Sequence, residues 1–255
     1  MELVPVVDVY STLLCLYNLI IRVTKNVLRI PVNLKRIPHE QCYPHAKIKR
    51  FPNFRAPWLH GEYVAVFERR HIISKFEPCH RILDLGCGDG TYTRHLETKA
   101  TEVVGLDCNV ERLAKVKNIS AQVVLGDALH LPFKDQSFNI IWASEVIEHT
   151  PTLEIFSELE RVAKGTITVT VPNSSGPYYR RDPTHILEYD VPKLEQFLAR
   201  RDWTYTINGL GLCLPYKIIP DIIRKMFLKL TWRHPRYAFS ILITGYPRQG
   251  MRISE

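Results

Sequence analysis

The sequence predicts an α/β domain built on a mostly parallel sheet of seven strands, with helices on both faces. Between residues 62 and 200, short apolar segments alternate with amphipathic segments of helical length. This alternation is typical of β-α-β units, in which successive strands run parallel. The 255 residues suffice for one large domain, and the 45% hydrophobic and 24% charged fractions are those of an ordinary globular protein.

The individual elements follow from local patterns. Apolar residues at helical spacing between Val64 and Ile73 predict a first helix that ends before Pro78. The β-branched run "TITVTV" predicts a strand, and "WTYTINGL" and "AFSILITGY" predict two closing strands. The expected helices are 62–76, 91–98, 109–117, 153–163 and 192–200. The expected strands are 81–85, 102–106, 121–125, 138–143, 166–171, 203–210 and 238–246.

Two segments lie outside this alternation. Residues 1–60 are expected to form an N-terminal extension, an apolar helix followed by an irregular basic and aromatic stretch, and 61–250 the main domain. The uncharged run Val9–Ile21 has thirteen residues, too short for a bilayer span of ~20. Acidic rather than basic residues precede it, unlike a signal peptide. The second segment is an amphipathic insert, 213–235. Each apolar segment suits either a helix at a membrane surface or one packed on the domain.

The net charge of +8 is unevenly distributed. Residues 1–60 carry nine Lys or Arg against three acids, and 213–255 carry eight against two. Any attraction to phosphate or anionic lipid therefore belongs to the flanks, although a solvated basic surface gives the same counts. The six cysteines show no paired spacing, which favours reduced thiols in the cytoplasm.

A glycine-rich turn follows the first predicted strand, in "LDLGCGDGTY". Gly86, Gly88 and Gly90 permit positive φ angles and a close approach of the backbone to a ligand, ahead of a helix N-terminus that favours anions. The third glycine comes one residue earlier than in dinucleotide-binding Gly-x-Gly-x-x-Gly turns. Asp84 precedes the turn, where it suits an amine. A ligand with both a carboxylate and an ammonium group, such as the methionine moiety of S-adenosylmethionine, fits this combination.

Two further acids follow the next two predicted strands. Asp107 is placed to accept hydrogen bonds from both ribose hydroxyls. Asp127 is placed to accept from the adenine amine, with apolar Ala128 and Leu129 beside the ring. Ligands of open α/β sheets collect at the carboxyl ends of the strands, so these acids are expected to surround one ligand. A Rossmann-like domain that binds another nucleotide is the alternative.

Residues 81–172 resemble the class I S-adenosylmethionine-dependent methyltransferases, through "DLGCGDG", "GLD", "GDALHLPF", "SEVIEH" and "VPN". The motif set implies the cofactor and a Rossmann-like fold, but no substrate. The further pattern Glu-x-x-Glu-His with a later His-x-Leu-Glu-Tyr resembles two groups within this family. They are the small-RNA 3′-terminal 2′-O-methyltransferases and the O-methyltransferases of ubiquinone biosynthesis.

That resemblance implies that Glu145, Glu148, His149 and His185 are catalytic and hold a divalent metal near the methyl group. If a helical turn begins at Glu145, the first three share one face. Mg²⁺ prefers oxygen ligands, whereas two histidines suit Mn²⁺, Fe²⁺ or Zn²⁺ better. Without a metal, His149 or His185 is the candidate general base. A structural role for His185 remains open.

Three functions remain open. The favoured one is O-methylation of a small, lipid-linked or glycan hydroxyl by a cytoplasmic enzyme that associates peripherally with an anionic membrane surface. The second is RNA 2′-O-methylation, supported by basic and aromatic residues in "KIKRFPNFRAPW". The third is a non-catalytic scaffold, against which the intact glycine turn and its acids argue. The sequence does not determine the acceptor or the oligomeric state.

Overall fold

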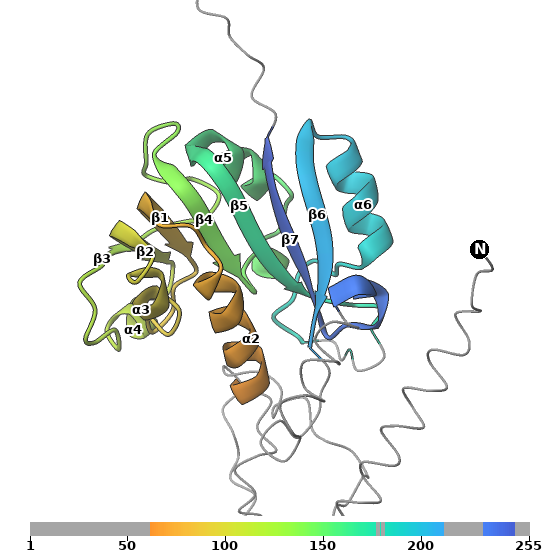
Figure 1. Ribbon diagram of the computed structural model, residues 1–255, viewed down its shortest axis with the longest axis horizontal. Helices are drawn as coiled ribbons and strands as arrows, with labels where there is room; N and C mark the ends of the chain where they lie inside the picture. The colour runs from red at the N-terminus through yellow and green to blue at the C-terminus, as the bar shows by residue number, and fades with distance from the viewer. Residues whose placement is uncertain (1–61, 177–178, 180–181, 212–231, 248–255) are drawn as a thin grey trace, which may run out of the picture. The chain divides into compact units, whose positions relative to one another are not determined.

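A seven-stranded sheet forms the centre of the computed structural model, which describes residues 62–176, 179, 182–211 and 232–247. The described residues all belong to one compact unit. The strand order is β3-β2-β1-β4-β5-β7-β6, as Figure 1 shows from one edge of the sheet to the other. Strands β1 to β5 pair in parallel, and β7 runs antiparallel between β5 and β6. The strands are β1 Cys79–Leu85, β2 Ala100–Asp107, β3 Gln122–Leu125, β4 Phe138–Ser144, β5 Ala163–Pro172, β6 Trp203–Leu210 and β7 Ser240–Pro247.

Each face of the sheet buries a separate apolar cluster, because successive strand side chains point to opposite faces. Helices α5 and α6 pack on one face, where Phe156 and Leu194 are buried. Helix α2 packs on the other, where Ile73 lies in one cluster with Trp142. The helices are α2 Glu62–Ser74, α3 Thr93–Leu96, α4 Val110–Leu113, α5 Ile155–Val162 and α6 Val191–Ala199, with 3₁₀ turns η2 Ile147–His149 and η3 Pro235–Tyr237.

The expected fold class is confirmed, and all seven expected strands are present. Two helices are much shorter than expected: 91–98 reduces to Thr93–Leu96, and 109–117 to Val110–Leu113, while the other helices differ from the expected bounds by at most two residues at each end. Asn109 caps the second helix by accepting a hydrogen bond from Arg112 N, but Asn118 then adopts φ +57°, which no α-helix continues through. The extension 1–60 and most of the insert 213–235 lie outside the described residues. The described part of the chain contains no helix long and apolar enough to cross a membrane.

The strand order reverses its direction between the neighbouring strands β1 and β4. After β1 the chain continues to β2 and β3 on one side of the sheet, and after β4 it continues to β5 on the other side. The loops that leave the carboxyl ends of β1 and β4 therefore run in opposite directions. Ligands of open α/β sheets bind at this switch point. The glycine turn follows β1, and the "SEVIEHT" segment begins at the last residue of β4, so both lie at this switch point.

Candidate functional site

The glycine turn after β1 has the conformation that its sequence predicts. Gly86, Gly88 and Gly90 have φ angles of +69°, +57° and +81°. A Cβ atom at Gly86 would lie 2.3 Å from Cγ2 of Val146, so only glycine fits there. A Cβ atom at Gly88 would meet no heavy atom within 4 Å, although Gly88 itself is buried. The turn therefore leaves open space above Gly88, where a ligand can approach the backbone.

Asp107, at the end of β2, holds this turn in place. Its Oδ2 accepts a 2.9 Å hydrogen bond from Gly88 N, and its Oδ1 accepts a 2.8 Å bond from Asn109 N. Arg112 Nη1 lies 3.9 Å from the same Oδ2. A carboxylate has about four lone-pair sites, so these contacts leave capacity for ligand hydroxyls.

Asp84, at the end of β1, is buried and accepts a 2.6 Å hydrogen bond from Thr93 Oγ1. Burial raises its pKa to about 7, the Thr93 bond opposes this rise, and the nearby negative charge of Asp107 adds to it. A cation beside Asp84 would favour its charged form. Asp84 therefore lies buried at the end of β1, next to the glycine turn, with Thr93 as its hydrogen-bond partner.

Asp127, after β3, is exposed, and its carboxylate orders the surrounding loop by accepting hydrogen bonds within it. Asp127 Oδ1 accepts a 2.9 Å bond from Leu129 N, which is the main reason that its pKa is lowered; a contact of Oδ2 with His130 adds to this. Ala128 and Leu129 are partly buried against the core. The acid stands at a neighbouring strand end, as the sequence predicts.

Glu145, directly after β4, does not begin a helical turn. Its φ angle is +56°, and its backbone N–H donates to Thr170 O at 2.9 Å. Its Oε1 accepts a 2.5 Å bond from Arg69 Nη2, while its Oε2 is buried without a hydrogen-bond partner. Only Ile147–His149 is helical, so the expected common face of the two glutamates is not formed.

Three of the four residues expected to bind a metal come together. Glu148, His149 and His185 each offer one ligand atom, and these atoms lie within 4.8 Å of one another; Glu145 is not a member of this group. His149 Nδ1 lies 3.0 Å from Thr184 O, to which it can donate, leaving Nε2 as the free lone pair. The rings of His149 and His185 stack edge to face, with centroids 5.0 Å apart.

Backbone hydrogen bonds bring the later loop over η2. Ile186 N and Leu187 N both donate to the carbonyl oxygen of Glu148, at 2.8 and 3.1 Å. These two bonds hold His185 near the end of β4, although His185 lies 36 positions after His149 in the sequence. The sequence pattern predicts the four residues but not this loop pairing, which depends on tertiary contacts.

Glu148 is the most unusual group of this cluster. The residue is 1% exposed, and neither carboxylate oxygen has a hydrogen-bond partner. Burial raises its pKa well above the usual value, and the carboxylate of Glu145 raises it further. A buried carboxylate without donors is costly unless a cation or a ligand donor satisfies it.

The structure adds three residues to which the sequence analysis gives no role, although Tyr189 is the tyrosine of the His-x-Leu-Glu-Tyr pattern. Glu68 and Arg69 of α2 are both buried, although "FERRH" has the composition of a solvated helix face. Arg69 contacts the end of β4, and Glu68 lies beside Gly211, which follows β6. The Tyr189 hydroxyl is buried without a hydrogen-bond partner. Burial raises the pKa of Tyr189, and the charge of Glu148 contributes to this rise. Only tertiary contacts identify Glu68 and Arg69.

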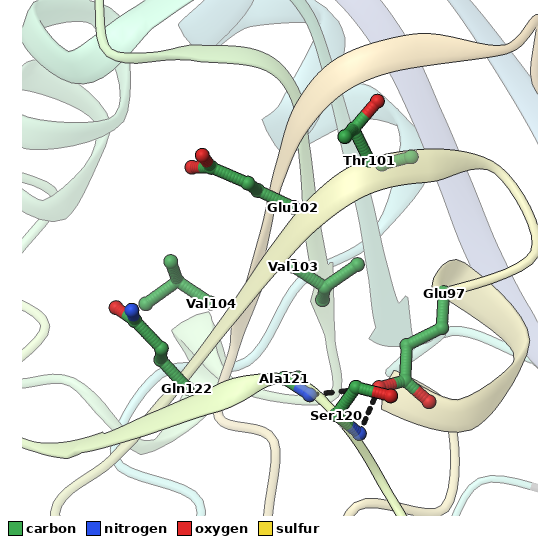
Figure 2. Close-up of a pocket in the computed structure, with 9 residues that line it drawn as sticks. Glu97, Thr101, Glu102, Val103, Val104, Ser120, Ala121 and Gln122 are labelled. Atoms are coloured by element: carbon green, nitrogen blue, oxygen red, sulfur yellow. Dashed lines mark hydrogen bonds between the residues drawn. The ribbon is translucent and has the colours of Figure 1, made fainter.

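A hollow of about 240 Å³ lies away from this site, along the first half of β2 and the start of β3 (Figure 2). There Glu97 Oε1 accepts hydrogen bonds from Ser120 N and Ala121 N, drawn as dashed lines. The hollow is at the amino ends of the strands, whereas Asp84 and Asp107 end β1 and β2. It is therefore not part of the candidate site.

Comparison with known proteins finds similarity in the part of the chain that contains the glycine turn and the segment after β4. Residues 83–166 match the family model of a methyltransferase domain. The chain is 34% identical over 98 residues to "Sterol 24-C-methyltransferase erg6" of Schizosaccharomyces pombe, covering 34% of this chain and 26% of that protein. It is 33% identical over 149 residues to "Malonyl-[acyl-carrier protein] O-methyltransferase" of Hamiltonella defensa, covering 55% of this chain and 58% of that protein. The match spans less than two thirds of either relative.

Solved structures show the same fold at low identity. The crystal structure of a SAM-dependent methyltransferase from Archaeoglobus fulgidus aligns with a TM-score of 0.56 at 21% identity. The alignment covers 72% of this chain and 93% of that one. The expected Rossmann-like arrangement is therefore confirmed.

Proposed function

We propose that this chain, whose central part is a class I S-adenosylmethionine-dependent methyltransferase domain, transfers a methyl group from S-adenosylmethionine to an oxygen acceptor. The open space above Gly88 is the observation that carries the cofactor part of this proposal, because Asp107 fixes a backbone turn around a position where no side chain lies. A scaffold would have no reason to keep that space free.

The groups around the turn then have separate tasks. Asp84 pairs with the ammonium group of the methionine moiety, and the glycine turn offers backbone N–H groups to its carboxylate. Asp107 accepts from the ribose hydroxyls. Asp127 accepts from the adenine amine, with Ala128 beside the ring. These assignments place the methionine end beside β1, toward the β4 end.

The cluster beyond β4 supports oxygen as the acceptor atom. The named relatives include both a carbon and an oxygen methyltransferase, so the comparisons leave this choice open. A hydroxyl is a poor nucleophile until its proton is removed, and without a cation Glu148, His149 or His185 would accept that proton. Burial and the negative charge of Glu145 both raise the pKa of Glu148.

The same three residues also fit a divalent cation. Both oxygens of Glu148 lack donors, and the Nδ1 contact of His149 with Thr184 O leaves Nε2 available. A bound cation would supply positive charge that lowers the pKa of an acceptor hydroxyl. We propose that Glu148, His149 and His185 hold it, while His149 keeps its orientation through Thr184.

We propose an amphipathic or lipid-linked acceptor. The support is the apolar and basic composition of residues 9–30 and 215–232, together with the sterol and acyl-carrier substrates named for the relatives. The same segments support peripheral association with an anionic membrane surface, and the unpaired spacing of the cysteines supports a cytoplasmic location. RNA is the second candidate, supported by the basic and aromatic residues of 47–58.

Calorimetric titration of the full chain with S-adenosylmethionine tests the cofactor assignment. Micromolar binding is expected, and no binding would leave the scaffold function.

Methyl transfer to catechol is compared with transfer to phenol, with and without chelator, for the native chain and Glu148→Ala. Activity that neither chelator nor the substitution changes would exclude the cation.

Two assays separate the acceptor classes. Sedimentation with anionic liposomes, lost on deletion of residues 1–30, is the result expected for a membrane-associated enzyme. Salt-sensitive binding to a short single-stranded RNA, without liposome binding, would favour RNA instead.

A further inference from the structure

Arg69 of α2 reaches the carboxyl ends of β4 and β5 and the start of β7. Its Nε donates to Ser144 Oγ at 2.8 Å, and its Nη2 donates to Glu145 Oε1 at 2.5 Å. Longer bonds of 3.4 Å join it to Thr170 Oγ1 and Ser240 Oγ. The guanidinium is thus held by groups from 75 to 171 positions away in the sequence, and the Arg69 side chain is only 4% exposed.

This network also fixes Glu145. Its Oε1 accepts a second bond from Thr170 Oγ1 at 3.1 Å, and its backbone N–H is bound to Thr170 O. Because Glu145 has a left-handed backbone and the helical turn is limited to Ile147–His149, Glu145 and Glu148 do not share a helix face. The pairing with Arg69 neutralises its charge inside the protein.

We infer that Arg69 is a positioning residue that keeps Glu145 out of the cation's coordination sphere, so that the cation site consists of Glu148, His149 and His185. This inference rests on the cation site of the proposed function and departs from the four-residue pattern that the sequence predicts. The group of potential ligand atoms within 4.8 Å of one another contains these three residues and not Glu145.

The chemical consequence concerns which cation is bound. One carboxylate and two imidazoles give a site with a single negative charge and a majority of nitrogen ligands. Such a set favours Mn²⁺, Fe²⁺, Co²⁺ or Zn²⁺ over Mg²⁺, which prefers oxygen ligands and more negative charge. Three protein ligands also leave coordination positions for an acceptor.

Titration of the full chain with Mn²⁺, followed by electron paramagnetic resonance, tests the inference without an activity assay. Glu145→Gln should retain Mn²⁺ affinity to within about twofold, whereas Glu148→Gln, its matched control, should weaken it by about a hundredfold. Arg69→Gln should tighten Mn²⁺ binding by about tenfold, because the released carboxylate adds a second negative charge. The double substitution Arg69→Gln/Glu145→Gln should return to the native affinity, which a merely structural role of Arg69 would not produce.

A folded Glu145→Gln variant that loses about tenfold or more in Mn²⁺ affinity would overturn the inference. Because variants of the buried pair can fail to fold, a competition on the native chain provides a second test. A hundredfold excess of Mg²⁺, roughly, should displace less than half of the Mn²⁺, and equal competition would overturn the inference. A native chain that binds S-adenosylmethionine but not Mn²⁺ would overturn both this inference and the cation site, while the cofactor assignment would stand.

Discussion

Thr93 donates a 2.6 Å hydrogen bond to Asp84 across the glycine turn, and both side chains are buried. The bond links the end of β1 to the first residue of α3, so it closes the turn from both sides. It does not compensate for burial, which raises the pKa of Asp84 to about 7. The carboxyl group of Asp84 therefore gains or loses its proton near neutral pH. A cationic ligand bound beside it would favour the charged form.

The first prediction concerns cofactor affinity and pH. If Asp84 pairs with the ammonium group, S-adenosylmethionine should bind more weakly as pH falls below 7, because the neutral acid must first lose its proton. The loss should approach about tenfold per pH unit. Calorimetry at pH 5.5 to 7.5 measures it, and Asp84→Asn serves as the control. The variant should bind weakly and without this slope, whereas an equal slope in both proteins would place the titration elsewhere.

The second prediction concerns Asp107. Asp107→Ala should weaken S-adenosylmethionine binding by more than about tenfold, since it removes a ribose acceptor and the hydrogen bond that holds Gly88 N. The loss of two backbone hydrogen bonds should also lower the free energy of unfolding by about 1–3 kcal/mol. Asp127→Ala should lower it by only about 0.5 kcal/mol, because this exposed carboxylate accepts a single backbone hydrogen bond. Unaltered affinity in Asp107→Ala would remove the ribose assignment.

The sheet and the cofactor turn were predictable because their signals are local. Buried strands require apolar runs, and the positive φ angles of Gly86, Gly88 and Gly90 require residues without a Cβ atom. Asp84 and Asp107 follow from the same logic, because each stands at the end of an apolar run.

The cluster after β4 was only partly predictable. The sequence places Glu145 one helical turn from Glu148 and His149, but the hydrogen bond of Glu145 N to Thr170 O and the charge of Arg69 impose a left-handed conformation. A pattern within five residues contains no information about a guanidinium 76 positions away. Tertiary contacts overrode the local helical preference.

The third prediction concerns stability and the buried carboxyl group of Glu68. Burial raises its pKa from 4.5 to about 8, and the positive charge of Arg69 opposes this. Because the folded-state pKa lies above the unfolded value, the contribution to stability is fully present below pH 4.5 and is lost as pH rises to about 8. Within that window the loss should approach about 1.4 kcal/mol per pH unit.

Glu68→Gln tests this directly, because the amide has nearly the same shape and does not titrate. Urea unfolding at pH 5 and pH 8 should show a smaller decrease for the variant than for the native chain. At pH 8 the variant should be the more stable protein, because its neutral amide avoids the cost of a buried negative charge. Parallel pH profiles for the two proteins would show that Glu68 is not the group responsible.

The fourth prediction separates the two neighbouring glycines. Gly86→Ala should lower the free energy of unfolding by about 3 kcal/mol, because its Cβ atom would lie 2.3 Å from Val146 and its φ is positive. Gly88→Ala should cost only about 1–2 kcal/mol, the conformational part, since no atom lies within 4 Å of its Cβ position.

Of the two glycine variants, Gly88→Ala should be destabilised less, but it should lose cofactor binding. The methyl group of Gly88→Ala would occupy the space assigned to the ligand, so S-adenosylmethionine binding should be lost while the domain stays folded. Val146→Ala should partly restore the stability of Gly86→Ala by removing the atom that its Cβ meets, and it should have no such effect on Gly88→Ala. Thermal unfolding and calorimetry measure both quantities. A folded Gly88→Ala variant with native affinity would mean that the cofactor lies elsewhere, because no ligand that contacts this turn can share that space with a side chain.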